Sequence, residues 1–228
     1  MSDTSGVPTS AAPVAPSPYR RNYRRYGTHE VILRQVPPGS NVLDVGCATG
    51  YLAEPLRERD CRVWGLDRDA AAVSIAASSY EEVHVVDLDL CESLPVPDRF
   101  FDVVLCADVL EHLREPERGL RLVGPHLAQG GTIVISLPNV AHLSVRLPLL
   151  FGRFEYGPSG ILDRTHVRLF TFRTARELVM SCGFDVHREL GASDRFGGLL
   201  HALGPLRKPL RGILAYNIVM IATAAAGR

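Results

Sequence analysis

Several features that mark secreted, membrane or nucleic-acid-binding proteins are scarce in this sequence. The five cysteines form an odd set without a Cys-x-x-Cys pair, which fits neither a disulfide framework nor a zinc site. Lysine plus arginine equals aspartate plus glutamate at 25 each, so the net charge favours neither nucleic acid nor an anionic membrane as a partner. The most apolar late stretch, 218–225, is too short to span a bilayer. We therefore expect a cytoplasmic protein with reduced, buried cysteines and without membrane or nucleic-acid partners.

The chain begins with 18 residues rich in Ser, Pro and Ala that lack the basic and apolar segments of a signal peptide. We expect residues 1–18 to form a disordered tail. Residues 19–36 are rich in Arg and Tyr and precede Pro37, which is typical of a helix that ends there. This helix could be a lid over a ligand or simply a solvated helix. The length that remains predicts one domain over residues 19–228.

From residue 41 onward, short β-branched runs alternate with helical stretches. This alternation is the pattern of βαβ units around a parallel sheet. The expected strands are 41–46, 61–66, 82–86, 102–106 and 131–136, with helices near 50–59, 69–78, 109–114 and 117–128 between them.

The end of the chain follows a different pattern. It predicts a helix at 174–182, a strand at 184–190, a Gly-rich loop from 191 to about 199 and a last strand near 217–224. Because no helix is expected between the last two strands, the pattern indicates an antiparallel, hairpin-like ending.

The most informative residues, DVGCATG at 44–50, lie where the first expected strand meets a helix. Glycines let the backbone approach a ligand closely, and a helix N-terminus offers free N–H donors. An NAD or FAD loop needs G-x-G-x-x-G, but Ala48 and Tyr51 occupy the second and third glycine positions. A Walker loop needs a lysine after Gly50, where none is present. Dinucleotides and nucleoside triphosphates are therefore both disfavoured.

Four motifs in the same order resemble those of class I S-adenosylmethionine-dependent methyltransferases. DVGCATG resembles the D/E-x-G-x-G-x-G loop, with Ala48 in place of the middle glycine. Asp67 in VWGLD matches the acidic residue that holds two ribose hydroxyls, and Asp87 in VHVVD matches the one near the adenine amino group. The segment DRFFDVVLCADVLEHL matches the fourth strand and the turn after it.

The resemblance implies a fold and a cofactor. The fold is an α/β, Rossmann-like, doubly wound seven-stranded sheet in the order 3-2-1-4-5-7-6, with strand seven antiparallel and the ligand over the C-terminal ends of strands one to four. The cofactor is S-adenosyl-L-methionine, and the product is S-adenosyl-L-homocysteine. The implied cofactor-binding residues are Asp44, Gly46, Cys47, Ala48, Gly50, Asp67, Arg68, Asp87, Leu88 and Cys106.

Some of these residues also have a plain structural interpretation. Asp67 alone could cap a helix and Asp87 alone could stabilise a turn, but their joint spacing favours a site. Asp44 lies inside an apolar strand, where a carboxylate is costly unless it is paired, and this also favours a place in the site.

A long segment at about 137–173 is rich in Arg, His and aromatic residues and is expected to face the substrate. Its LDRTHVRLFT stretch resembles the LDRTHxRxFT segment of a bacterial methyltransferase branch associated with sugar, glycan or secondary-metabolite modification. We expect His166 to be a catalytic base oriented by Asp163, with His112 as a further catalytic candidate. The alternative is that His166 and Asp163 only join this segment to the body, and that His112 only caps or packs.

Other polar residues of the segment are weaker candidates. Asn139 and His142 could line the acceptor pocket. Four arginines could hold a carboxylate or phosphate or could be solvated, namely Arg146, Arg153, Arg164 and Arg168. No clustered set of Asp, Glu and His is visible, so no metal is expected.

Methyl transfer from a sulfonium is an in-line displacement, and a hydroxyl acceptor also needs a base. We predict methyl transfer to a hydroxyl of a small molecule such as a sugar, glycan precursor or secondary metabolite, by a monomer or homodimer. An N-methyltransferase and a non-catalytic cofactor-binding module remain alternatives. A nucleic-acid methyltransferase is disfavoured, because the turn reads ADVLEHL rather than an Asn/Asp-Pro-Pro-aromatic clamp.

Overall fold

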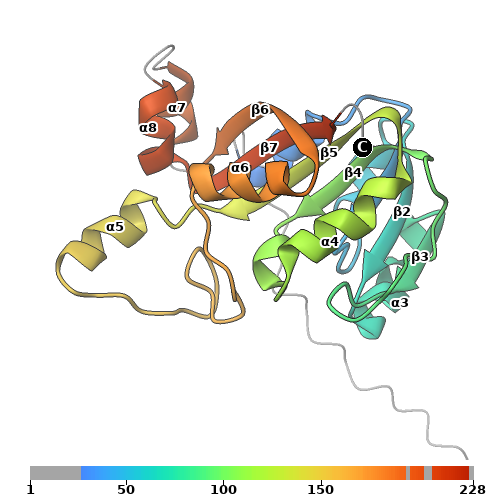
Figure 1. Cartoon of the computed structure of the whole chain (residues 1–228), viewed down its shortest axis with the longest axis horizontal. Coiled ribbons are helices and arrows are strands. Elements are labelled where there is room, and N and C mark those ends of the chain that lie inside the picture. The colour runs from blue at the N-terminus through green and yellow to red at the C-terminus, as the bar shows by residue number, and fades with distance from the viewer. Residues whose placement is uncertain (1–26, 194–195, 203–206, 226–228) are drawn as a thin grey trace, which may run out of the picture.

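The computed structural model describes residues 27–193, 196–202 and 207–225. In these residues the chain forms a seven-stranded sheet with helices on both faces (Figure 1). The tail expected at 1–18 lies outside the described residues, as does the 19–26 part of the Arg/Tyr-rich run. None of the described helices has the length and apolar character that a bilayer crossing requires.

The sheet has the strand order β3-β2-β1-β4-β5-β7-β6. Neighbours from β3 to β5 are parallel, whereas β7 is antiparallel to both β5 and β6. The expected fold class and strand order are therefore confirmed. The strands are β1 (Asn41–Val45), β2 (Arg62–Asp67), β3 (Glu82–Val85), β4 (Phe101–Ala107), β5 (Leu127–Pro138), β6 (Phe184–Ala192) and β7 (Asn217–Ala224).

The helices vary in length, and short 3-10 turns separate some of them from the strands. The turn that matters most for the site is η2 (Leu110–His112), directly after β4. The described α-helices are α1 (Thr28–Leu33), α2 (Ala53–Arg57), α3 (Ala70–Ala76), α4 (Pro116–Val123), α5 (Leu143–Leu150), α6 (Phe172–Ser181), α7 (Gly197–Ala202) and α8 (Arg207–Leu214).

Two hydrophobic clusters lie on opposite faces of the sheet. Leu43 of β1 belongs to the same cluster as Leu120 of α4 and Val179 of α6. The preceding residue, Val42, belongs to the second cluster together with Ile32 of α1. Because successive side chains of a strand point to opposite faces, this division places α4 and α6 on one face and α1 on the other. Burial on both faces explains why the inner strands β1, β4 and β7 are mostly apolar.

Some expected element boundaries were wrong. The helix expected at 117–128 ends at Val123, and β5 already begins at Leu127 rather than at 131. Gly124 and Pro125 lie between them, and proline cannot continue a helix. The helix expected at 109–114 is only the 3-10 turn η2.

The expected hairpin-like ending was also wrong in part. The last two strands are antiparallel neighbours, but α7 and α8 lie between them in the sequence. Antiparallel strands can be neighbours without a short loop between them, so the expected pairing did not exclude helices in the connection. The described part of the expected lid is α1, whose Ile32 is buried against the sheet.

Candidate active site

The C-terminal ends of β1, β2, β3 and β4 meet at one edge of the sheet. Strand order reverses between β1 and β4, which is where open α/β sheets bind ligands. A pocket of about 400 Å³ lies there. Each strand end contributes to its wall, through Val45–Gly46, Leu66–Asp67, Val86–Asp87 and Ala107–Asp108. The volume falls in the range of small-molecule sites.

The structure brings part of the expected cofactor-binding set together around this pocket. Six of the ten residues line it, namely Gly46, Ala48, Asp67, Arg68, Asp87 and Leu88. The remaining four are buried and do not line it, namely Asp44, Cys47, Gly50 and Cys106.

The turn after β1 packs tightly against the turn after β4. Gly46 has a φ of +72°, and a Cβ added there would lie 2.4 Å from Cγ2 of Val109, another residue of the pocket wall. Ala48 has a φ of 47° although it is not glycine. Non-glycine residues held in this region indicate a backbone that its surroundings constrain. Gly46 is therefore required by close packing as well as by its conformation.

Two carboxylates of the pocket are oriented by backbone N–H groups. Asp67 accepts hydrogen bonds from the N–H of Ala48 at 2.8 Å and of Asp69 at 2.9 Å, one on each oxygen. Asp87 accepts one from the N–H of Asp89 at 2.9 Å. A carboxylate has roughly four acceptor sites. Both groups can therefore accept further hydrogen bonds from hydroxyl or amino groups of a ligand.

Asp44 is buried within β1 rather than exposed to the pocket. Its carboxyl accepts a hydrogen bond of 2.7 Å from the hydroxyl of Tyr80. Burial, opposed by this bond and reinforced by Asp67, raises the pKa of Asp44 to about 7. The neighbouring thiols are unreactive, because burial raises the pKa of Cys106 to about 12 and that of Cys47 still further. The sequence predicted a partner for the Asp44 carboxyl in its apolar strand, and that partner is the uncharged hydroxyl of Tyr80.

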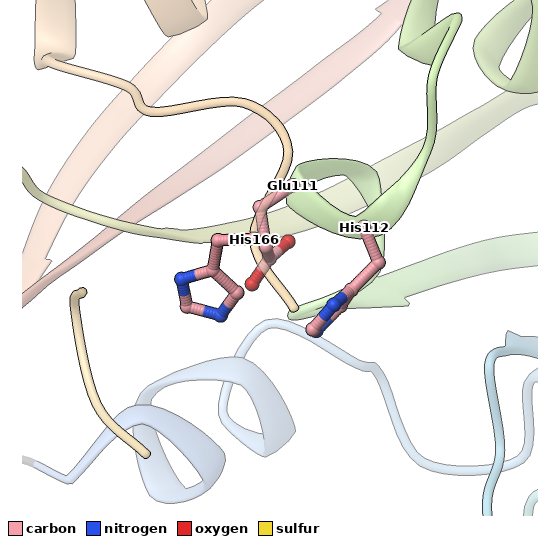
Figure 2. Close-up of side chains that lie close together, drawn as sticks. All are labelled: Glu111, His112 and His166. Carbon is pink, nitrogen blue, oxygen red and sulfur yellow. The ribbon is translucent and has the colours of Figure 1, made fainter. Parts of the chain in front are cut away.

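A group of three ionisable side chains lies beside the pocket. Figure 2 shows Glu111, His112 and His166, with the Glu111 carboxylate pointing toward the space between the imidazole rings. Each residue offers a ligand atom, and these atoms all lie within 4.8 Å of one another. The backbone N–H groups of Val167 and Arg168 donate to the Glu111 carbonyl at 2.9 and 3.1 Å. These bonds join the 137–173 segment to η2 and bring His166 to His112.

Both imidazoles are oriented by backbone carbonyls. The Nδ1 of His112 lies 3.2 Å from the Thr165 oxygen, and that of His166 lies 3.0 Å from the Ile161 oxygen. A carbonyl can only accept, so each Nδ1 carries the proton in these bonds. In a neutral imidazole the other nitrogen, Nε2, then has the lone pair. Burial lowers the pKa of His112, with a smaller contribution from His166 in the same direction, which favours this neutral form.

Glu111 is the functional candidate that the sequence did not reveal. Its side chain is 1% exposed, and neither carboxylate oxygen has a hydrogen-bond partner among the described residues. Burial, with the nearby Asp108, raises the pKa of this carboxyl well above its usual value. The sequence showed no clustered Asp, Glu and His, because His166 lies far from the Glu111–His112 pair along the chain. The cluster exists only in the folded protein.

The expected role of Asp163 in orienting His166 was wrong. The Asp163 carboxylate accepts from the backbone N–H of Thr165 at 2.8 Å and from its hydroxyl at 2.7 Å. The partner of the His166 ring is instead the Ile161 carbonyl. Partial burial raises the pKa of Asp163, but the Thr165 bonds and His166 lower it on balance. The Asp163 carboxylate thus closes a local turn with Thr165, and among the described residues no hydrogen bond joins it to the His166 ring.

The weaker acceptor-site candidates do not line the pocket. Asn139 is fully buried and donates to the carbonyls of Gly212 and Ala215. His142 caps α5 by accepting from the N–H of Ser144 at 3.1 Å. The four arginines of the segment are all exposed, namely Arg146, Arg153, Arg164 and Arg168. His112 and Thr165 line the pocket, whereas His166 lies next to His112 with ring centroids 4.9 Å apart.

The sequence of this chain is similar to those of known methyltransferases. A family described as a methyltransferase domain matches residues 19–189. A probable S-adenosylmethionine-dependent methyltransferase of Mycolicibacterium smegmatis is 30% identical over 190 residues, covering 82% of this chain and 69% of the relative. A ubiquinone biosynthesis O-methyltransferase of Pseudomonas syringae is 33% identical over 108 residues, covering 44% of this chain and 45% of the relative. This match thus spans less than half of the second relative.

A solved structure shares the fold. A putative methyltransferase of Haloferax volcanii, in a complex with the Trm112 methyltransferase activator, superposes with a TM-score of 0.62 at 20% identity. The superposition covers 87% of this chain and 89% of the other.

Proposed function

This chain belongs to the class I S-adenosylmethionine-dependent methyltransferases, and on that premise we propose that it methylates a hydroxyl group of a small molecule. The donor supplies a methyl group on a positively charged sulfur. The protein must bind the donor, align the acceptor with the methyl carbon and activate the hydroxyl for attack.

We assign donor binding to the pocket wall formed by β1 to β4. The nucleoside of the donor has two ribose hydroxyls and an adenine amino group, and each of these can donate hydrogen bonds. Asp67 and Asp87 are acceptors at neighbouring strand ends, and backbone N–H groups hold each of them in place. The Gly46 turn gives the ligand access to the backbone between them. These residue types fit the donor, which supports the assignment.

The activation of the hydroxyl is assigned to His112 and His166. The observation that carries the proposal is that both Nδ1 atoms donate to carbonyls, so that in the neutral form of each ring the lone pair is on Nε2, beside the donor pocket. His112 lines the pocket directly, and His166 contacts its ring. An imidazole of this form can take the proton that a hydroxyl must lose. His166 remains the proposed base, with His112 between it and the donor pocket.

Two further observations favour a small hydroxylated acceptor. One relative is named as an O-methyltransferase of ubiquinone biosynthesis, although it shares only part of its length with this chain. The LDRTHVRLFT stretch that carries His166 resembles a branch associated with sugar, glycan and secondary-metabolite modification. An amine acceptor needs no strong base when it is already neutral, so the two imidazoles favour oxygen over nitrogen.

The test is transfer of a labelled methyl group from S-adenosylmethionine to matched acceptor panels. The panels are hydroxylated compounds, covering sugars and phenols, and the corresponding amines. We expect product with hydroxyl acceptors and a rate that falls when His166 is replaced by alanine. Product only with amines would support N-methylation. Donor binding without turnover on any member of either panel would support the non-catalytic module.

A further inference from the structure

The cluster beside the donor pocket has the composition of a metal site. We propose that Glu111, His112 and His166 bind one divalent transition-metal cation, of the class to which Zn²⁺ and Co²⁺ belong. Two imidazole nitrogens and one carboxylate oxygen form a common three-ligand set for such ions, with the remaining positions open to water or substrate. Mg²⁺ and Ca²⁺ prefer sets made of oxygen alone.

The partners of the two rings are those that metal-binding histidines usually have. A histidine that binds a metal through one nitrogen generally donates the other N–H to a carbonyl or carboxylate, which fixes the tautomer and the orientation of the ring. Here Thr165 and Ile161 supply those carbonyls at 3.2 and 3.0 Å. The Nε2 atoms of His112 and His166 are therefore the nitrogens available to a cation.

Glu111 provides an independent observation. A buried carboxylate without a partner is costly, and native proteins seldom keep one without a reason. Both Glu111 oxygens lack a partner among the described residues, and the side chain points toward the space between the two rings (Figure 2). A cation there would give the carboxylate the partner that the protein itself does not provide.

The spacing and the local charge also suit a cation. Two ligands of one ion lie at most about 4.2 Å apart when each bond is about 2.1 Å. The ligand atoms here lie within 4.8 Å of one another, so small side-chain rotations complete the site. The charged groups that act on the cluster from outside are Asp108, Asp163 and Arg68. With Glu111 ionised, negative charge exceeds positive charge around the site.

The position of the cluster suggests what the cation does, and this part rests on the proposed function. His112 lines the donor pocket, so an acceptor hydroxyl that reaches the donor also reaches the cation. Coordination makes a hydroxyl more acidic, and the proton passes to solvent water. The oxygen then bonds to the methyl carbon while the carbon–sulfur bond breaks and its electron pair remains on sulfur. In this state the imidazoles act as ligands, and the metal-bound hydroxyl loses its proton to water instead of to an imidazole.

The experiment titrates the full, chelator-stripped chain with Zn²⁺ by calorimetry and with Co²⁺ by visible absorption. We expect one equivalent to bind, with absorption bands typical of nitrogen and oxygen ligands. Glu111→Gln and His166→Ala are each expected to weaken binding about 100-fold or more, since even the loss of an outer-shell partner costs roughly 10 to 100-fold. His84→Ala is the matched control, because the half-buried His84 and the exposed Glu82 form a histidine–carboxylate pair at 3.3 Å elsewhere. This variant should bind as the wild type does.

Thermal unfolding gives a second readout that a purely structural role would not produce. In the metal-free protein, Glu111→Gln should change the unfolding temperature little, because a neutral amide replaces a carboxyl group of the same shape that also lacks partners. The same variant should lose the rise that Zn²⁺ produces in the wild type. Equal Zn²⁺ affinity in wild type and both cluster variants would overturn the proposal.

Metal binding and methyl transfer can fail separately. Turnover that survives complete chelation would reject the catalytic role of the cation and leave the proposed function standing. Conversely, one equivalent of Co²⁺ bound through these three residues, without methylation of either acceptor panel, would support the site and reject the function.

Discussion

The two sides of the pocket differ in how their residues are held. The donor side consists of strand ends embedded in the sheet, where Val45, Leu66 and Ala107 are all buried. The 137–173 segment contributes Thr165 to the pocket wall, and parts of it are far from the core: Leu150 is 78% exposed and Phe151 is 80% exposed. In Figure 1, α5 and the chain after it extend away from the sheet. The strand ends are thus part of the hydrophobic core, whereas much of the 137–173 segment lies outside it.

Several hydrogen bonds join the 137–173 segment to the turn after β4. Val167 and Arg168 donate to the Glu111 carbonyl, and His112 donates to the Thr165 carbonyl. Mutations in the exposed part of this segment should cost the core little, whereas Phe170 and the strand ends pack in the hydrophobic clusters. We therefore expect that different mutations will impair donor binding and acceptor activation separately.

The largest expected effect is on the donor side. Asp67→Ala removes the acceptor that we propose for the two ribose hydroxyls and the observed acceptor for the N–H of Ala48. Two hydrogen bonds to a charged group at about 2 kcal/mol each correspond to roughly a thousandfold weaker donor binding. Calorimetric titration with S-adenosylmethionine measures this change directly. A wild-type dissociation constant in this variant would exclude Asp67 from the donor site.

The converse effect is expected on the acceptor side. His166→Ala should lower turnover about 100-fold, the lower range for the loss of a general base, and change donor affinity less than about threefold. Labelled-methyl turnover and the same calorimetric titration provide the two numbers. If the two variants lose donor binding equally, the proposed division of roles is incorrect.

Replacing one glycine on each side by alanine tests how tightly each side is packed. Gly46 and Gly152 have φ values of +72° and +71°, so alanine is strained at both positions by about 1 kcal/mol. Only Gly46 has a neighbour in the way, Cγ2 of Val109 at 2.4 Å, whereas nothing lies within 4 Å of the Cβ at Gly152. Gly46→Ala should therefore lower the free energy of unfolding by about 2 to 4 kcal/mol, and Gly152→Ala by about 1. Urea denaturation compares them, and equal losses would show that the Gly46 turn can move.

The smallest expected effect concerns pH. The pKa of Asp44 is about 7 in the folded protein and 3.8 ordinarily, so the folded state binds the extra proton between these values. The free energy of unfolding therefore falls as pH rises from about 4 to 7 and then levels. Asp44→Asn should remove this part of the fall, a gain of about 1 kcal/mol or more at pH 8 and none near pH 4. Denaturation curves at both pH values test it, and a gain independent of pH would point to altered packing instead.

Much of the donor side could be predicted from the sequence because short, local motifs contain its residues. Gly46 directly follows β1, Asp67 is the last residue of β2 and Asp87 lies two residues after β3, and these parallel strands end at the same edge of the sheet. The errors there concern residues such as Cys106, whose side chain faces the core rather than the pocket. A sequence specifies that a residue lies on a buried strand more readily than the face to which it points.

The sequence by itself determined the alternation of strands and helices and the donor motifs, because hydrophobic periodicity and short motifs are local properties. The strand order was implied by the resemblance that those motifs carry. Only the tertiary structure decided that Glu111, His112 and His166 meet, since this depends on hydrogen bonds between η2 and a segment far along the chain. It also decided that Ile161, rather than Asp163, orients His166. Such contacts arise from packing of an irregular segment against the core, and no periodic pattern in the sequence encodes them.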